Sequence, residues 1–409
     1  MRNELMQTEA QRARHTYICG VTGSGKSTEA KHQALSDIEA GRGLAYVDPH
    51  GQDVLELLDA IPKRRINDVL YFNVLDREHP ITFNPVTHRD LPNLEAEKLT
   101  SIFKDKWIDS GWSERMSRYT AKTLALLMHL QGSDLTMVQD ILTNKPFRDG
   151  KLKKVTDEAL LQFWTEEYPT KSAREKEEAP SAIINRIGQL TDNEYLRPIL
   201  QCEQPSLNPA DCIKRNRIVL VNLAKMTIGE NAADAFGALL IGSFFHAAMS
   251  RPAHEIAPFP MYIDEAQTFI THAFIPVLSE ARKFALWLTL LNQYTAQLPE
   301  SVQDAIFGNV GTLISFQVGA DDAPKIARQL DLEPDELSHG TGSRFIAPEQ
   351  RLRRLKPFQG FYHYQGETTD HSVEPFTAAR GTASRVIAQS RRQFGRTGKR
   401  SARLSPSTR

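Results

Sequence analysis

Short apolar runs separated by helix-like segments recur along much of the chain. Runs at 15–19, 43–48, 68–74, 217–223, 259–263, 284–291, 311–318 and 360–366 have the length of strands. Residues 284–291 (FALWLTLL) are apolar on both faces, which is typical of a central parallel strand. Segments 27–40, 231–251 and 274–285 show the spacing of helices packed on a sheet. We therefore predict an α/β fold with a central, mostly parallel sheet.

The pattern changes from strands to helices between about residues 91 and 204. Apolar and aromatic residues such as Trp107, Trp112 and Tyr119 recur there at helical intervals. We predict an all-α insertion at 91–204 within a motor-like domain formed by 1–90 and 205–375, followed by a tail at 376–409. The insertion has sixteen Lys or Arg and eighteen Asp or Glu, so its net charge gives no indication of nucleic-acid contact. Its aromatics fit a core better than platforms for base stacking.

Composition narrows the class of protein. The 409 residues are 40% hydrophobic and 24% charged, which is ordinary for a globular chain of two or three domains. Apolar runs stay shorter than the roughly 18 residues of a membrane span, and the first fifteen residues have no apolar core of a secretion signal. Three cysteines without metal-site spacing favour a reducing compartment. We expect a cytoplasmic protein, recruited to a membrane only through a partner.

The formal net charge of zero hides a basic C-terminus. From Arg380 to Arg409 there are nine Lys or Arg and no Asp or Glu, in a stretch rich in Ser, Thr and Gly. We predict that this tail is disordered. It could bind phosphate backbones without sequence preference, or be a plain solvated terminus.

The most specific motif is GVTGSGKS at 20–27, which fits the phosphate-loop pattern G-x-x-x-x-G-K-[ST] between a predicted strand and a predicted helix. Glycines allow the backbone to fold around a polyphosphate, so that amides and the helix N-terminus face its charge. Lys26 is expected to reach the β and γ phosphates, and the Ser27 hydroxyl to bind Mg²⁺. The predicted nucleotide-binding residues are Gly20, Thr22, Gly23, Ser24, Gly25, Lys26, Ser27 and Thr28.

A second acidic motif follows the strand at 259–263. Asp264 at the strand end is placed to hold Mg²⁺, and Glu265 beside it can orient and deprotonate an attacking water. The alternative is a polar strand end or helix cap. Near the DPHG corner, Asp48 also ends a strand, and we interpret His50 as a plain turn residue.

The segment SEARKFALWLTLLNQY places Arg282 before the apolar strand and Gln293 after it. Gln293 then lies at the carboxyl edge of the sheet, where nucleotides bind in such folds, and is placed to sense the γ phosphate. Arg282 is about 30 Å away by strand rise. It could act as an arginine finger on a neighbouring subunit's nucleotide, which implies a ring. Alternatively, it is a surface residue paired with Glu280 or a carbonyl.

Together, GVTGSGKST, AYVDPHG, ITFNP, MYIDEAQTF, LSEARKFALWLTLLNQY and DAIFGNVGTLISFQVGADDA resemble the HerA/FtsK superfamily of ring ATPases, and are most similar to the coupling proteins of conjugative type IV secretion. The resemblance covers most of residues 12–365. It implies a RecA-like P-loop motor with a helical insertion, forming a hexamer that uses ATP and Mg²⁺ to move DNA. Partners of the secretion-channel or relaxase type are also implied. Unlike typical coupling proteins, the sequence shows no transmembrane helix.

Carried onto this sequence, the resemblance makes Lys26 and Ser27 the phosphate and Mg²⁺ ligands, and Asp264 and Glu265 the metal carboxylate and catalytic base. It makes Arg282 the finger from the adjacent subunit, Gln293 the sensor, and Arg14 a residue near the nucleotide. Preference for ATP over GTP and the ring size rest on this resemblance alone. Two other functions stay open: an ATPase that delivers or remodels proteins of a secretion complex, and a nucleotide-gated recruiter without steady turnover.

Overall fold

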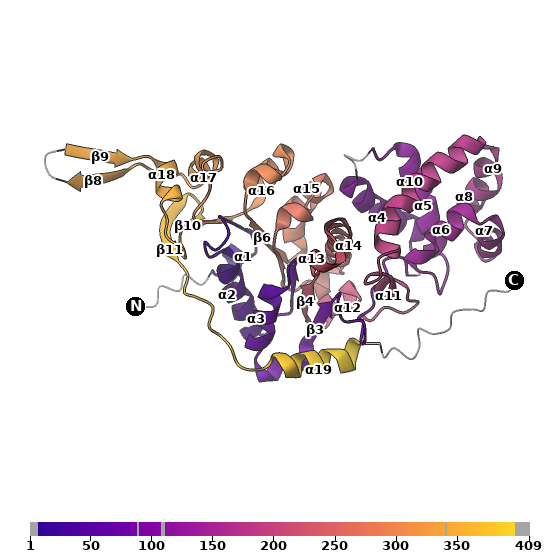
Figure 1. The fold of residues 1–409 in the computed structure, drawn as a ribbon, viewed down its shortest axis with the longest axis horizontal. Coiled ribbons are helices and arrows are strands. Elements are labelled where there is room, and N and C mark those ends of the chain that lie inside the picture. The colour runs from indigo at the N-terminus through magenta and orange to yellow at the C-terminus, as the bar shows by residue number, and fades with distance from the viewer. Residues whose placement is uncertain (1–6, 88–89, 108–110, 340–341, 397–409) are drawn as a thin grey trace. The chain divides into compact units, whose positions relative to one another are not determined.

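The computed structural model describes residues 7–87, 90–107, 111–339 and 342–396. Within them, nine strands form one sheet in the order β11-β10-β7-β1-β6-β5-β2-β4-β3 (Figure 1). Strands β7, β1, β6, β5, β2 and β4 pair in parallel, whereas β10 and β11 form an antiparallel edge. The strands are β1 Thr16–Cys19, β2 Leu44–Asp48, β3 Val69–Asn73, β4 Ile218–Asn222, β5 Phe259–Ile263, β6 Leu286–Asn292, β7 Thr312–Ser315, β10 Gln359–Tyr364 and β11 Glu367–Ser372. The predicted α/β class with a mostly parallel sheet is confirmed.

The chain divides into two compact units. The first comprises 1–71, 210–222 and 245–388, and the second comprises 72–209, 223–244 and 389–409. The predicted insertion at 91–204 falls entirely within the second unit. That unit also takes in residues on either side of the insertion, so its limits differ from the predicted boundaries.

The first unit has a helix layer on each face of its sheet. Ile18 of β1 belongs to a buried cluster that includes residues of α2 and α3. The neighbouring Tyr17 packs its ring edge-on against Phe307 of α16, at 5.6 Å between centroids. Because successive side chains of a strand point to opposite faces, these contacts place α2 and α3 on one face and α16 on the other. The helices of this unit are α1 Glu9–Arg12, α2 Lys26–Glu39, α3 Gln52–Ala60, α12 Pro209–Lys214, α15 Ile275–Glu280, α16 Glu300–Asn309, α17 Ala323–Gln329 and α18 Pro348–Arg353, with a separate hairpin of β8 Asp335–His339 and β9 Gly342–Ile346.

The second unit is largely helical, and its aromatic residues form its core. Trp107, Trp112 and Tyr119 are each less than 8% exposed, and the two tryptophans stack at 6.0 Å between ring centroids. The interpretation of these aromatics as core residues is confirmed. The helices are α4 Pro92–Lys106, α5 Glu114–Met128, α6 Val138–Thr143, α7 Lys145–Leu152, α8 Glu158–Gln162, α9 Tyr168–Thr170, α10 Ala173–Thr191, α11 Arg197–Leu200 and α13 Lys225–Ile228.

Helix α14, Glu230–Met249, begins in the second unit and ends in the first. In the described part of the chain it alone is long and apolar enough to cross a membrane, and 67% of its most apolar stretch is buried.

The prediction of a disordered tail is wrong for residues 383–394, which form helix α19, Ala383–Phe394 (Figure 1). Val386 is fully buried in the same cluster as α2 and α3. Just before the helix, the Thr382 hydroxyl donates to the carbonyl of Leu58 at 3.1 Å and lies close to those of Asp59 and Ile61. One buried apolar side chain and a threonine that bonds to the end of α3 thus help to anchor a segment of strongly basic composition. Residues 397–409 of the predicted tail lie outside the described residues.

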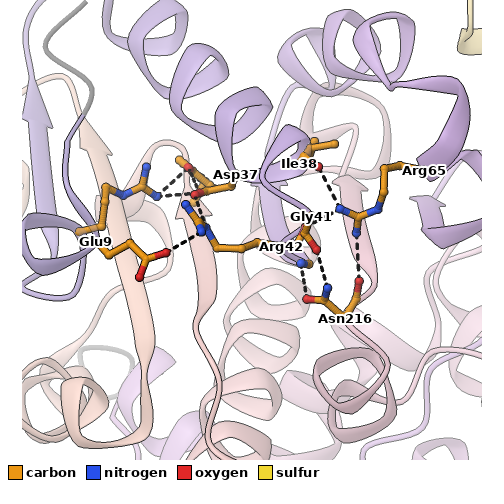
Figure 2. A network of polar contacts seen from close by, with 10 residues as sticks. Glu9, Asp37, Ile38, Gly41, Arg42, Arg65 and Asn216 are labelled. Carbon is orange, nitrogen blue, oxygen red and sulfur yellow. Dashed lines mark hydrogen bonds and ion pairs between the residues drawn. The ribbon is translucent and has the colours of Figure 1, made fainter.

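A buried polar network ties the far end of α2 to its neighbours (Figure 2). The Asp37 carboxylate accepts from Arg12 at 2.8 Å, from the Tyr262 hydroxyl at 2.6 Å and from Arg42 at 3.1 Å. Arg42 also pairs with Glu9 at 2.8 Å. Because Tyr262 lies in β5, two residues before Asp264, this carboxylate links the helix that follows the phosphate loop to the strand that carries the acidic pair.

Candidate functional site

The loop between β1 and α2 has a backbone that only glycine fits at two positions. Gly20 has φ 153° and Gly25 has φ 122°, both outside the region that other residues favour. A Cβ on Gly20 would lie 2.7 Å from the Ser24 hydroxyl, and one on Gly25 would lie 3.0 Å from the Phe316 ring. The loop is therefore packed directly against the end of β7, which fixes its shape before any ligand binds.

Lys26 begins α2 and folds back over this loop. Its ammonium donates to the carbonyl of Val21 at 3.1 Å, and the side chain is almost fully buried. Burial lowers the pKa of Lys26, while the charges of Glu265 and Asp264 act in the opposite direction. The Lys26 ammonium is thus held at a loop carbonyl, close enough to Asp264 and Glu265 for their charges to affect its pKa.

The acidic pair stands at the end of β5, next to β2 in the sheet. Burial raises the pKa of Asp264 well above its ordinary range, and the charges of Asp53, Asp48 and Glu265 raise it further. Asp48 ends β2 and accepts from the backbone amides of His50 at 2.8 Å and Val54 at 3.2 Å. This geometry confirms the turn at His50.

The pKa of Asp48 is also raised, by burial and then by the nearby charge of Asp53. Carboxylates at the ends of β2 and β5 and at the start of α3 therefore concentrate negative charge around Asp264. Lys31 pairs with Asp53 at 3.2 Å, and the other carboxylates fit a divalent cation. Among the described residues, no three His, Cys, Asp or Glu side chains converge as a metal cage. A hard ion that keeps waters and takes phosphate oxygens, as Mg²⁺ does, matches that arrangement.

Glu265 is held by two amides. The Gln293 amide nitrogen lies 2.5 Å from Oε1 of Glu265, and the Gln267 amide nitrogen lies 2.5 Å from Oε2. The carbonyl oxygen of Gln293 in turn accepts from the Thr22 hydroxyl at 3.1 Å. The structure thus brings together the predicted residues Lys26, Thr22, Asp264, Glu265 and Gln293.

Arg282 lies at the amino-terminal end of the parallel strands, opposite the carboxyl end where the phosphate loop and the acidic pair lie. Residues 281–284 form a 3-10 turn just before β6, whereas Gln293 follows the end of that strand. Seven residues of β6 separate the two ends, about 23 Å at roughly 3.3 Å per residue. Glu280, one candidate partner of Arg282, binds Lys283 at 2.6 Å. Arg282 is exposed and lies outside the group around its own phosphate loop.

Arg14 is also at this second end of the sheet, away from the phosphate loop of its own chain, and its place near a nucleotide stays a prediction. It precedes β1, and its carbonyl accepts from the Gly311 amide at 2.6 Å. It lines a cavity of about 250 Å³ together with Phe307 and His363. The intervening strand keeps this side chain away from the loop that follows β1.

Sequence reasoning missed two contributors to the site. Gln267 is one: it lies two residues after Glu265 in the segment DEAQ at 264–267, and this short spacing could have indicated it. Asp53 was also missed, although it lies in the first turn of the helix that follows the DPHG corner.

No family model and no curated protein sequence matches the chain. Solved structures do resemble it. The conjugative coupling protein TrwB, in a truncated form with sulphate, aligns with a TM-score of 0.64 at 14% identity, covering 89% of this chain and 86% of that one. The chain shares the fold of the coupling protein TrwB. A TrwB structure with ADP and Mg²⁺ also gives a TM-score of 0.64 at 14% identity, covering 92% of this chain and 89% of TrwB.

VirB4 of Thermoanaerobacter pseudethanolicus aligns with a TM-score of 0.56 at 16% identity, covering 88% of this chain and 89% of VirB4. The likeness to TrwB and VirB4 spans both units, so the predicted RecA-like P-loop fold with an all-α insertion is confirmed.

Proposed function

We propose that this chain is an ATPase that uses hydrolysis to move DNA, as a motor of conjugative transfer or type IV secretion. The observation that carries this proposal is the convergence of a shaped phosphate loop, a buried acidic pair and Gln293 at the carboxyl edge of one parallel sheet. TrwB, which has the same fold, has been solved with ADP and Mg²⁺ and with a non-hydrolysable ATP analogue.

In the proposed reaction, the oxygen of a water molecule attacks the γ phosphorus, and the bond to the β–γ bridging oxygen breaks. Glu265 accepts the proton that the water loses. Lys26 neutralises charge on the β and γ phosphates, and the loop amides bind their oxygens. Gln293, bonded to both Thr22 and Glu265, is placed to detect whether a γ phosphate is present.

Ser27 and Asp264 are the residues that would hold Mg²⁺. When bound, the ion would neutralise charge that develops on the phosphate oxygens. The crowding of Asp48, Asp53 and Asp264 supports this assignment, because a divalent cation relieves repulsion among buried carboxylates.

We further propose that each site is completed by Arg282 of a neighbouring subunit. The residue is exposed at the edge of the sheet opposite its own phosphate loop, so it is placed to act across an interface. Head-to-tail contact of one edge with the other closes into a ring when the rotation between subunits allows it. A hexamer, DNA as substrate and partners of the secretion-channel or relaxase type are the expectations that the resemblance adds, with a membrane reached through such a partner.

The test is the steady-state ATPase rate with no DNA, with single-stranded DNA and with double-stranded DNA. The proposal expects multiple turnovers and stimulation by at least one DNA form. Hydrolysis without stimulation by either form would favour an ATPase acting on proteins. Nucleotide binding without turnover would favour a nucleotide-gated recruiter. Either result would overturn the DNA motor.

A further inference from the structure

Both oxygens of the Glu265 carboxylate are engaged, and by amides that come from different parts of the chain. Gln293 follows β6 and bonds to Oε1, while Gln267 lies in the 3-10 turn Ala266–Thr268 and bonds to Oε2. A carboxylate only accepts hydrogen bonds, so each amide must present its nitrogen to it. For Gln293 this leaves the oxygen facing Thr22, which donates to it. The hydrogen-bond network therefore fixes the orientation of both amides.

The two amides differ in what else they touch. Gln293 also contacts Thr22 of the phosphate loop, so a ligand in that loop can alter its bond to Glu265. Gln267 belongs to the same turn as Glu265, and its nitrogen serves only to bridge the two residues in the contacts that the structure shows. Oε1 of Glu265 thus binds Gln293, a partner that a nucleotide in the loop can displace. Oε2 binds Gln267, which does not depend on the loop.

The turn that carries Gln267 is firmly anchored. Glu265 has φ 48°, a left-handed conformation that is uncommon for a residue other than glycine. Its carbonyl accepts from the Thr268 amide at 2.8 Å, and the Ala266 carbonyl accepts from Ile270 at 2.9 Å. Ala266, Phe269 and Ile270 are each less than 5% exposed. The backbone therefore holds Gln267 at a fixed place beside the carboxylate.

We propose that Gln267 is a positioning residue for Glu265, an inference that rests on the proposed ATPase function. It holds Oε2 throughout the cycle, so that Oε1 is presented to the attacking water once Gln293 turns toward the nucleotide. A carboxylate that could rotate freely would meet the water in a productive geometry less often, and small misplacements of a catalytic group are costly. The side-chain bond that the structure gives Gln267 is to Glu265 and not to the phosphate loop, so its removal should slow the chemical step and leave nucleotide affinity unchanged.

The test compares Gln267→Ala with wild type in steady-state ATPase assays and in the binding of a fluorescent ATP analogue. We expect kcat to fall by about 10-fold or more, as for other residues that orient a catalytic group, with KM and the analogue affinity changed less than about twofold. Gln267→Glu keeps the size of the side chain but replaces the donor with a like charge, and should lower kcat at least as much. Gln350→Ala, a change of the same kind at an exposed site, should have no effect.

A double-mutant cycle separates positioning from a general structural role. In a Glu265→Gln background, Gln267→Ala should cause no further loss of residual turnover, because the group that it positions is already disabled. An unchanged kcat for Gln267→Ala, a rise in KM alone, or an equal further loss in the Glu265→Gln background would each overturn the inference. Wild-type protein that hydrolyses no ATP would overturn the proposed function and this inference together. An active wild-type protein whose kcat is unchanged by Gln267→Ala would overturn this inference alone.

Discussion

The amide nitrogen of Gln293 lies 2.5 Å from the carboxylate of Glu265, although 28 residues separate them in the sequence. Strand β6 brings them together, because it pairs with both β5 and β1 and so ends between the acidic pair and the phosphate loop. The side chain that touches the proposed base is therefore also the one that touches the loop, through Thr22. Loop occupancy and the state of the base are linked by a single side chain.

Glu265→Gln should retain nucleotide binding and lose hydrolysis. The amide keeps the size of the side chain but cannot accept a proton from water, so we expect kcat to fall by about 10²- to 10⁴-fold. Single-turnover ATPase assays beside equilibrium binding of an ATP analogue measure the two effects separately. The matched control is Glu97→Gln, at an exposed position on α4, which should behave as wild type. Retention of more than half of the wild-type rate by Glu265→Gln would exclude it as the base.

Lys26→Ala should instead weaken binding as well as catalysis. The ammonium is the cation held inside the loop, and without it the phosphate charge is left to the backbone amides. We expect a loss of turnover of at least about 10²-fold together with a clear rise in the dissociation constant of the ATP analogue. Unchanged affinity measured by fluorescence titration would show that the phosphates bind elsewhere.

Local pattern was enough to predict eight of the nine strands of the sheet, the phosphate loop and the acidic pair, because each depends on residues adjacent in sequence; β11 was not predicted. Three features depended on tertiary structure instead. The contact of Gln267 with Glu265 requires the left-handed backbone of Glu265, which no propensity indicates. Helix α19 is anchored by one buried apolar side chain, Val386, and the basic composition around it resembles that of a disordered tail. Arg14 was placed by analogy, and its distance from the loop became visible only once β1 was seen to separate them.

His15 makes stability depend on pH. Burial lowers its pKa to about 4, and its Nδ1 accepts from the Leu288 amide at 3.1 Å, which requires an unprotonated nitrogen. In the unfolded chain His15 has an ordinary pKa near 6.5, so between about pH 6.5 and pH 4 it is protonated in the unfolded state and neutral in the folded state. Stability is therefore complete above about pH 6.5 and falls as the pH drops from there toward 4.

For this single group we expect the free energy of unfolding to fall by about 2 kcal/mol between pH 7 and pH 5. His15→Asn, chosen because asparagine tolerates the φ of 61° at this position, should lose that part of the pH dependence. Urea unfolding at a series of pH values measures both proteins. Equal slopes for variant and wild type would show that His15 is not the responsible group.

Asp37→Ala should be strongly destabilising. The change leaves the buried Arg12 guanidinium and the Tyr262 hydroxyl without their shared acceptor. Loss of one partner from a buried ion pair costs about 3–5 kcal/mol in the free energy of unfolding. The control is Glu280→Ala, which removes an exposed ion pair with Lys283 and should cost about 0–1 kcal/mol. Similar urea midpoints for the two variants would mean that the network of Figure 2 contributes little.

The central claim is that one subunit supplies the phosphate loop and the next supplies Arg282. It is tested most directly by mixing two variants, Lys26→Ala and Arg282→Ala, and measuring ATPase activity with DNA present. Each variant alone should be inactive. When equal amounts of the two variants form rings at random, about a quarter of the interfaces pair an intact loop with an intact arginine. The mixture should therefore regain about a quarter of the wild-type activity. A mixture that shows no more activity than the sum of the two variants would contradict a site shared between subunits.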